Sequence, residues 1–585
     1  MRYKEIRALL LKRFHIPKAR AISRTMRSFT MAEKAVFYFF ASVFILSGFI
    51  MAWQVSEAFL VEVPIRGGTL AEGVVGNPRF INPVLALSEA DKNLTAVVYS
   101  GLVRLTPEGL ITNDLASQVQ ISKDERVYTV TISKDARFHD DAPVTADDII
   151  FTISKIADPV IKSPRRGNWD GVAVEKVDER TVTFTLKKAY TPFIYNLTTG
   201  ILPKHIWNNV SNDEFSFSQF NTLPVGSGPF EVVRVDRNKG GIPDYYMLKP
   251  NSHTSGREPY IENLVFHFYP SETALIDAYN NGTVDSVSGI SPENVAKVNS
   301  HGSQVIHSPL PRIFAVFFNQ TKSKALANLG VRRALDLAAP KERIVEDILG
   351  GYATPIDGPI PAGIYDWSIG GTNMKSPEER LELARQMLSK DGWVLNLENG
   401  VLEKKSGSAI ITLSFSISTG DVPELRQVAE ELKGAWEKLG AKVDILVYET
   451  GDLNQNVIRP RQFESLLFGE VVGRDADVYP FWHSSQRNDP GLNIALYANT
   501  KADKLLENAR STSDKKSAEK NYKAFYEEIR NDSPAVFLYT PSFLYIVPEN
   551  LKAVNPGPLA ITQDRFLGIR DWYIETDKVW KIFLN

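Results

Sequence analysis

The chain has no cysteine among its 585 residues, which excludes disulfides, thiolate metal sites and thiol nucleophiles. The same absence excludes a lipid-modified cysteine as a membrane tether. Only eight histidines are present, none of them in an HExxH pattern, and no GxSxG nucleophile elbow occurs. We therefore expect a protein that is not an enzyme and that needs no metal or cofactor.

Charge is absent from Ala35–Val55, a run of 21 residues that can cross about 30 Å of hydrocarbon as a helix. The preceding residues 1–34 carry ten Lys and Arg against two Glu, so the positive-inside rule places this tail in the cytoplasm. The alternative is a cleaved signal peptide, with the small residues Ser56 and Ala58 near the cleavage site. We expect a single-pass protein of the plasma membrane, with residues 56–68 as a linker.

The remainder of the chain has the opposite charge. In residues 56–585 the acidic side chains exceed the basic ones by ten. Nucleic-acid-binding proteins present basic patches, so this balance argues against a nucleic-acid partner. The basic tail before it is interpreted as a topology signal that also contacts lipid headgroups.

Leu115–Ile156 carries strong local signals. Val127–Ile132 alternates between two faces and predicts a strand. Thr145 and, three residues later, Asp148 predict the capping box of a helix. The apolar stripe of that helix is Ile149, Ile150, Ile153 and Ile156.

A second region repeats the alternation of strand and helix. Residues 410–418 and 442–448 predict strands, and residues 422–439 between them predict an amphipathic helix. Strand, helix and strand in this order imply an α/β lobe with a mixed sheet. No internal repeat and no low-complexity tract is present.

Several of these segments, in order along the chain, resemble the solute-binding proteins of family 5, the peptide- and nickel-binding receptors of ABC importers. The resemblance covers about residues 65–545. One departure is Ala338–Lys341, which stands where the family has Ala-Ile-Asp-Arg. The matching motifs are Leu115–Val119 (LASQV), Arg137–Ile153 (RFHDDAPVTADDIIFTI), Gly226–Phe230 (GSGPF), Val331–Leu335 (VRRAL) and Asp532–Tyr539 (DSPAVFLY).

The resemblance implies an α/β, two-lobed, periplasmic-binding-protein-like fold with an extra inserted subdomain, preceded here by one transmembrane helix. Two hinge strands, near Pro311–Phe314 and Tyr539–Phe543, would let the lobes close over a ligand. The expected divisions are lobe I at 62–104, 222–309 and 540–585, the inserted subdomain at 105–221, and lobe II at 310–539.

The resemblance also implies that Leu466–Gln486 lines the ligand cleft. In peptide-binding members an aspartate there pairs with the amino terminus of the peptide, but the corresponding position is Val472. Glu470 is the nearest substitute, on the same face of the strand by period 2. The candidate ligand-binding residues are Asn82, Arg312, Glu470, Gly473, Arg474, Asp477 and Trp482.

Alternative interpretations remain open at several of these positions. Asn82 and Asp477 are also typical turn residues, and Trp482 is also a typical core residue. The expected partners are a peptide, the permease subunits of an importer and the membrane, with the chain itself a monomer. Another solute (a nickel chelate or an oligosaccharide) or a surface-interaction scaffold is the alternative function.

Overall fold

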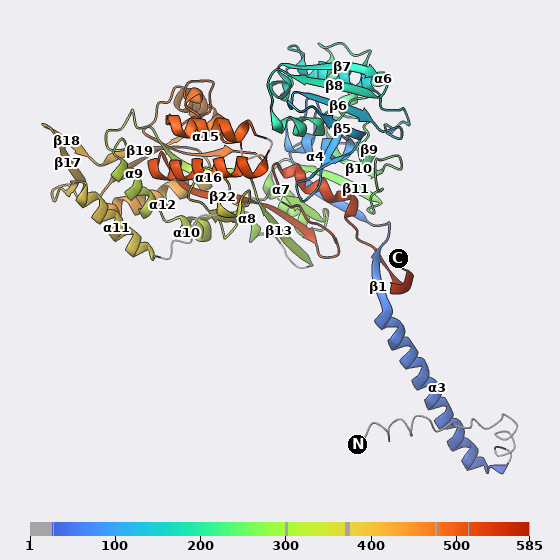
Figure 1. Ribbon diagram of the computed structural model, residues 1–585. Helices are drawn as coiled ribbons and strands as arrows, with labels where there is room; N and C mark the ends of the chain where they lie inside the picture. The colour runs from blue at the N-terminus through green and yellow to red at the C-terminus, as the bar shows by residue number, and fades with distance from the viewer. Residues whose placement is uncertain are drawn as a thin grey trace, which may run out of the picture. The chain divides into compact units, whose positions relative to one another are not determined.

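The chain divides into two compact units, one formed by Met1–Ile65 with Thr576–Asn585 and the other by Arg66–Glu575. In the first unit, helix α3 (Met31–Phe59) leads into strand β1 (Leu60–Pro64), as Figure 1 shows. The structure is a computed structural model, and it describes residues 26, 28–298, 302–368, 375–473, 477–512, 514–557 and 559–583.

Helix α3 contains the uncharged run and extends beyond it at both ends. The Thr30 side chain caps its start, accepting a hydrogen bond from the Glu33 N–H, while the Glu33 carboxylate accepts one from the Thr30 N–H at 2.8 Å. By length and composition it is the one helix among the described residues that could cross a membrane. Part of the predicted linker is ordered, because β1 pairs antiparallel with β23 (Thr576–Trp580).

The large unit is organised around one twelve-stranded sheet. Its order is β20 (Lys442–Tyr448), β19 (Ser414–Gly420), β21 (Ser465–Val471), β14 (Arg312–Phe318), β22 (Ala535–Pro548), β12 (Ser286–Ser288), β2 (Thr69–Val75), β11 (Asn263–Tyr269), β10 (Pro243–Pro250) and β9 (Phe230–Arg237). Strands β13 (Ser303–Pro309) and β15 (Ala353–Pro355) also pair with β22. The sheet therefore continues from one lobe into the other through β22.

Two segments connect the strands of lobe I to those of lobe II. Leu310 and Pro311 connect β13 of lobe I to β14 of lobe II. Strand β22 pairs with β14 and β15 in its first half and with β12 and β13 in its second half. The change of partner falls between Pro541, opposite Ala353, and Ser542, opposite Pro309.

The inserted subdomain contains a four-stranded sheet covered by helix α5 (Ala146–Ala157). The predicted strand at Val127–Ile132 and the predicted helix after Thr145 are both confirmed. In β6 the side chains of Tyr128, Val130 and Ile132 are buried in alternation. Residues 105–221 share one hydrophobic core with lobe I rather than forming a core of their own. The strand order is β5 (Ala116–Ile121), β6 (Val127–Ile132), β8 (Thr181–Leu186) and β7 (Val172–Asp178).

Lobe II has two hydrophobic cores, one on each face of its part of the sheet. Along β14, Val316 and Phe318 belong to one core, whereas Ile313, Ala315 and Phe317 belong to the other. The first core includes buried residues of α9 (Leu329–Ala338), α11 (Pro377–Lys390) and α12 (Pro423–Leu439). The second includes residues of α14 (Tyr479–Trp482), α15 (Thr500–Arg510) and α16 (Lys515–Asp532), the last two side by side in Figure 1.

The other elements complete the two lobes. Lobe I contains a short β3–β4 pair, and lobe II contains a three-stranded sheet of β16, β17 and β18. Their bounds are β3 (Val103–Leu105), β4 (Ile111–Asn113), β16 (Val394–Leu395), β17 (Leu402–Ser406), β18 (Ala409–Thr412), α4 (Glu89–Val98), α6 (Lys204–Trp207), α7 (Glu272–Asn280), α8 (Pro292–Val295), α10 (Lys341–Arg343), α13 (Thr450–Asp452) and the 3-10 helices η2 (Thr191–Thr198) and η9 (Thr562–Asp571).

Candidate functional site

A cavity of about 460 Å3 lies at the hinge, with residues of both lobes in its wall. Lobe II contributes residues 362–364, and the β13–β14 connection contributes Pro309 and Pro311. Lobe I and its insertion contribute Glu108, Gly109, Tyr195, Ser308, Gly557 and Leu559. These segments are far apart in sequence, so sequence reasoning missed Glu108 and Tyr195, for which no local pattern gives a signal.

The wall of this cavity combines backbone, prolines and a few polar side chains. The Ser308 hydroxyl donates a hydrogen bond to the Gly557 carbonyl oxygen at 2.6 Å, which joins two lobe I segments of the wall. Glu108 and Tyr195 add a carboxylate and a phenol. Such a mixture of apolar surface with a few placed polar groups is typical of a small-molecule site.

Glu470 is a buried carboxylate on strand β21 of lobe II. It lies opposite Ile313 in the β14–β21 pair, on the face that carries the same core as Ala362 of the cavity wall. Its side chain is 5% exposed, and neither carboxylate oxygen has a hydrogen-bond partner among the described residues. Burial raises the pKa of the Glu470 carboxyl well above its ordinary value, so the neutral acid is favoured.

Arg312 lies on the opposite face of the same strand pair. It is opposite Val471, one position from the Ile313–Glu470 pair, and side chains alternate along a strand. Two residues further, Phe314 stacks on Tyr539 at 4.9 Å and belongs to the other core. Arg312 and Glu470 therefore do not converge on one pocket, and a binding role for Arg312 stays a prediction.

Two carboxylates, Glu424 and Glu293, approach the hinge on the face of the sheet that carries Arg312. Sequence reasoning missed both. The Tyr539 hydroxyl donates a hydrogen bond to Glu424, at the start of α12, at 3.4 Å. Burial raises the pKa of Glu424, the Tyr539 hydrogen bond opposes that shift, and the negative charge of Glu293 from lobe I adds to it. Glu293 and Glu424 lie in the first turns of α8 and α12. Acidic residues are common at the start of any helix, so their position in the sequence does not indicate a binding site.

The predicted residues after β21 differ in their surroundings. Gly473 has a φ of 85°, a conformation that favours glycine, and its N–H points to the Pro311 carbonyl oxygen at 3.4 Å. Asp477 is 9% exposed and pairs with Arg510 at 3.1 Å. Burial raises the pKa of Asp477 and the Arg510 charge opposes that shift. Arg474 lies outside the described residues.

Trp482 and Asn82 have structural surroundings. Trp482 is fully buried, with its ring 6.0 Å from Phe317 and 5.7 Å from Phe537. The Asn82 amide donates to the Asn221 side chain at 3.0 Å, and its oxygen accepts from the Val84 N–H at 2.8 Å. These contacts fit the core and turn interpretations, and a ligand contact stays a prediction for both residues.

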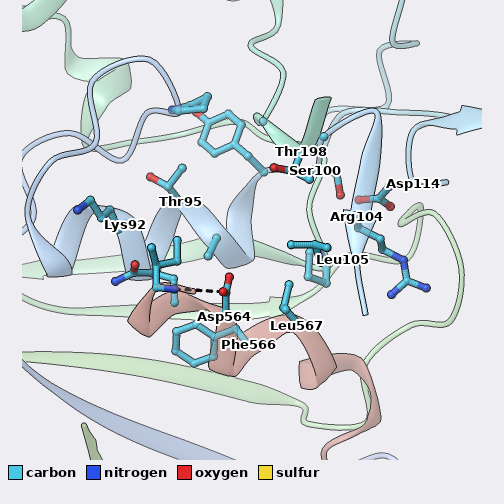
Figure 2. A pocket seen from close by; sticks show the side chains of 18 of the residues that line it. Lys92, Thr95, Ser100, Arg104, Leu105, Asp114, Thr198, Asp564, Phe566 and Leu567 are labelled. Atoms are coloured by element: carbon cyan, nitrogen blue, oxygen red, sulfur yellow. Dashed lines mark hydrogen bonds between the residues drawn. The ribbon is translucent and has the colours of Figure 1, made fainter. Parts of the chain in front are cut away.

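A second cavity, of about 200 Å3, lies entirely within lobe I and its insertion, between α4 and η9 (Figure 2). Thr95 and Leu567 face it from those two elements. The Asp564 carboxylate accepts hydrogen bonds from the backbone N–H groups of residues 560 and 561, at 2.7 and 3.2 Å, and so caps η9. No residue of lobe II lines this cavity, so it is separate from the hinge cavity.

In the part of the chain that the structure describes, no group of three or more His, Asp or Glu side chains could hold a metal ion.

A two-lobed α/β protein with a cavity at its hinge has the architecture of an extracytoplasmic solute-binding protein. The sequence profile of the bacterial extracellular solute-binding proteins, family 5 (middle region), matches residues 111–491. The chain belongs to this family. The predicted family and the predicted two-lobed fold are thereby confirmed.

Individual relatives agree with the family assignment. The oligopeptide-binding protein AppA of Bacillus subtilis (strain 168) is 28% identical over 505 residues, which cover 85% of this chain and 90% of AppA. The solved structure of AppA from Bacillus subtilis in complex with a nonapeptide matches with a TM-score of 0.64 at 26% identity, covering 88% of this chain and 100% of the other. NikZ from Campylobacter jejuni in complex with Ni(L-His) matches with a TM-score of 0.64 at 25% identity, covering 86% and 99%.

These relatives are solute-binding receptors rather than enzymes, and the family is extracellular. The binding domain of this chain therefore belongs outside the cytoplasm. The relatives also show that one fold accommodates ligands as different as a nonapeptide and a nickel chelate.

Proposed function

We propose that this chain is the substrate-binding receptor of an ABC importer, and that it captures oligopeptides between its two lobes and delivers them to a permease. The observation that carries the proposal is the hinge cavity, which has residues of both lobes in its wall. A cavity in that position is enclosed only when the lobes approach each other, as ligand capture by hinge closure requires. The nonapeptide bound to the AppA relative supports a peptide as the ligand.

The amino terminus of the peptide would bind at Glu470. A buried carboxylate without a hydrogen-bond partner among the described residues leaves a desolvated acceptor unsatisfied. An ammonium group would supply both a donor and a positive charge, and would return the carboxyl to its ionised form. Glu470 would thus take the role of the aspartate that peptide-binding members of the family have at the position of Val472.

The receptor would be tethered to the plasma membrane by α3 and would work as a monomer. The basic residues that precede the apolar run support a cytoplasmic amino terminus. A membrane-anchored receptor would stay near its permease at a higher effective concentration than a freely diffusing receptor.

The experiment that tests this function is native mass spectrometry of the full chain in lipid nanodiscs, purified without denaturation. Co-purified peptides of mixed sequence are the expected result. Co-purification of a single small molecule, such as a nickel chelate, would show that the ligand is another solute and not a peptide. An empty protein that also fails to bind a pool of peptides would instead favour an interaction scaffold.

The amine site has its own test, with a matched control. Glu470→Gln should weaken peptide binding about tenfold or more, since a charge-assisted hydrogen bond contributes roughly 1.5–3 kcal/mol. Glu424→Gln removes a partly buried carboxyl near the hinge on the opposite face of the sheet and should leave binding unchanged. N-acetylated peptides should bind the parent protein as weakly as free peptides bind Glu470→Gln. Equal affinity for free and acetylated peptides would rule out the amine site.

A further inference from the structure

One arginine contacts aromatic rings from both lobes. Arg510 ends helix α15 in lobe II, and its guanidinium carbon lies 4.7 Å from the centre of the Tyr479 ring. The same carbon lies 5.4 Å from the centre of the Tyr190 ring. Tyr479 packs against a lobe II core, whereas Tyr190 packs against the core that lobe I shares with its insertion. Arg510 therefore joins the two lobes through cation–π contacts.

The lobe II partners of Arg510 hold its side chain in place. The guanidinium Nη2 lies 3.1 Å from one carboxylate oxygen of Asp477, and the other oxygen accepts a hydrogen bond from the Tyr479 N–H at 3.3 Å. The Tyr479 ring in turn stacks on His483, with ring centres 4.2 Å apart. These contacts all lie within lobe II, so they do not require Tyr190 to be near and can hold the guanidinium in place when the lobes separate.

The position of Tyr190 connects this contact to the cleft. Tyr190 immediately precedes η2, the 3-10 helix that also supplies Tyr195 to the wall of the hinge cavity. One short segment of the inserted subdomain therefore borders the cavity and also receives Arg510. Opening of the lobes would break the Arg510–Tyr190 contact and leave the other contacts of Arg510 intact.

We propose that Arg510 is a positioning residue for lobe closure: its contact with Tyr190 stabilises the closed arrangement and slows release of the bound ligand. The consequence for ligand release rests on the receptor function proposed above. The effect on the lobes themselves does not depend on which solute is bound.

The absence of cysteine allows a direct test by distance measurement. Spin labels at the exposed positions Glu175→Cys and Lys516→Cys report the separation of the insertion from lobe II in the full chain in nanodiscs. Arg510→Met and Tyr190→Leu should each lower the ratio of closed to open molecules about two- to fivefold, the effect of one partly exposed cation–π contact. Tyr190→Phe keeps the aromatic face that Arg510 contacts and should retain more of the closed population than Tyr190→Leu.

A matched control removes a cation–π contact that lies within one lobe. Arg530 lies 5.9 Å from the centre of the Tyr526 ring, and both belong to α16, so Arg530→Met should leave the distances unchanged. An Arg510→Met distribution identical to that of Arg530→Met would overturn the proposal, as would a Tyr190→Leu distribution identical to that of Tyr190→Phe. Two variants at separate positions guard against a folding defect at either one.

Ligand release gives the second readout. Tyr190→Leu should release a bound peptide about two- to fivefold faster than Tyr190→Phe. Equal release rates together with unchanged distances would contradict the role of Arg510. If the parent protein binds no peptide at all, the receptor function fails, while the distance measurement still decides whether Arg510 holds the lobes together.

Discussion

The ion pair between Arg565 and Glu72 is fully buried in lobe I, and we expect its loss to destabilise that lobe strongly. Arg565 Nη2 lies 2.9 Å from Glu72 Oε1, and both side chains are 0% exposed. The other oxygen of Glu72 accepts hydrogen bonds from the hydroxyls of Tyr545, at 2.9 Å, and Ser286. Arg565 Nη1 donates to the Asn93 side chain at 3.1 Å. The pair thus joins η9, near the end of the chain, to strand β2 near the start of the large unit.

The expected magnitude follows from what each substitution leaves behind. Arg565→Met removes the positive charge and leaves the Glu72 carboxylate buried with two neutral donors, which costs about 3–5 kcal/mol. Adding Glu72→Met removes the stranded charge, so the double variant should recover part of that loss. Recovery should be incomplete, because the Tyr545 hydroxyl then loses its acceptor, at roughly 1–3 kcal/mol.

The assay is hydrogen exchange of the peptide that covers residues 562–571, combined with urea unfolding of the full chain in detergent. Exchange isolates lobe I, because a multi-lobed protein does not have to unfold in one step. Arg257→Met is the matched control. Arg257 pairs with Asp571 at the surface, where both side chains are about half exposed, and an exposed pair contributes at most about 1 kcal/mol. Equal losses for Arg565→Met and Arg257→Met would refute the reasoning.

Two further predictions concern pH. Burial raises the pKa of Glu470, so the folded state retains a proton that the unfolded state releases above the ordinary value of 4.5. Stability therefore falls, by up to about 1.4 kcal/mol per pH unit, as the pH rises from 4.5 to the raised pKa. Glu470→Gln should abolish this fall and be more stable than the parent at pH 7, and a less stable variant in urea titrations would contradict it. Burial lowers the pKa of His139 from 6.5 to about 4, against the opposing hydrogen bond to the Gly228 carbonyl oxygen, so the unfolded state binds the proton first. The His139 contribution is therefore complete above pH 6.5 and decreases by about 3 kcal/mol as the pH falls to 4. His139→Gln should flatten that part of the profile, and an unchanged slope would show that His139 is not responsible.

Local signals in the sequence predicted the elements that local physics determines. The alternation in Val127–Ile132 and the capping box of Thr145 and Asp148 appear in the structure as strand β6 and helix α5. Both signals depend on residues within one element, where periodicity and capping apply without knowledge of the rest of the fold. The positions of the hinge strands were proposed only through resemblance, since no local pattern distinguishes a hinge strand from another buried strand.

The candidate site was harder to predict, because faces and partners depend on register. Arg312 and Glu470 lie on the paired strands β14 and β21, but a shift of one residue in pairing exchanges the faces, and sequence does not give the register. The contact between Arg510 and Tyr190 joins residues that lie in different lobes and share no motif. Likewise, the pairing of β1 with β23 joins segments near opposite ends of the chain, which no local pattern predicts.

Each of the two connections between the lobes contains a proline. One contains Pro311 and the other contains Pro541, at the position where β22 changes its partner from lobe II to lobe I. Proline has no N–H to contribute to a sheet, so a bend at either position disrupts fewer hydrogen bonds than a bend elsewhere in the sheet.

Pro311 also lines the hinge cavity, together with Pro309. A ligand in that cavity therefore contacts one of the segments that must bend. A ligand shifts an equilibrium only through contacts that differ between the two states. The hinge connection is a place where such contacts change with the angle between the lobes, so closure can depend on occupancy of the cavity without a separate sensor.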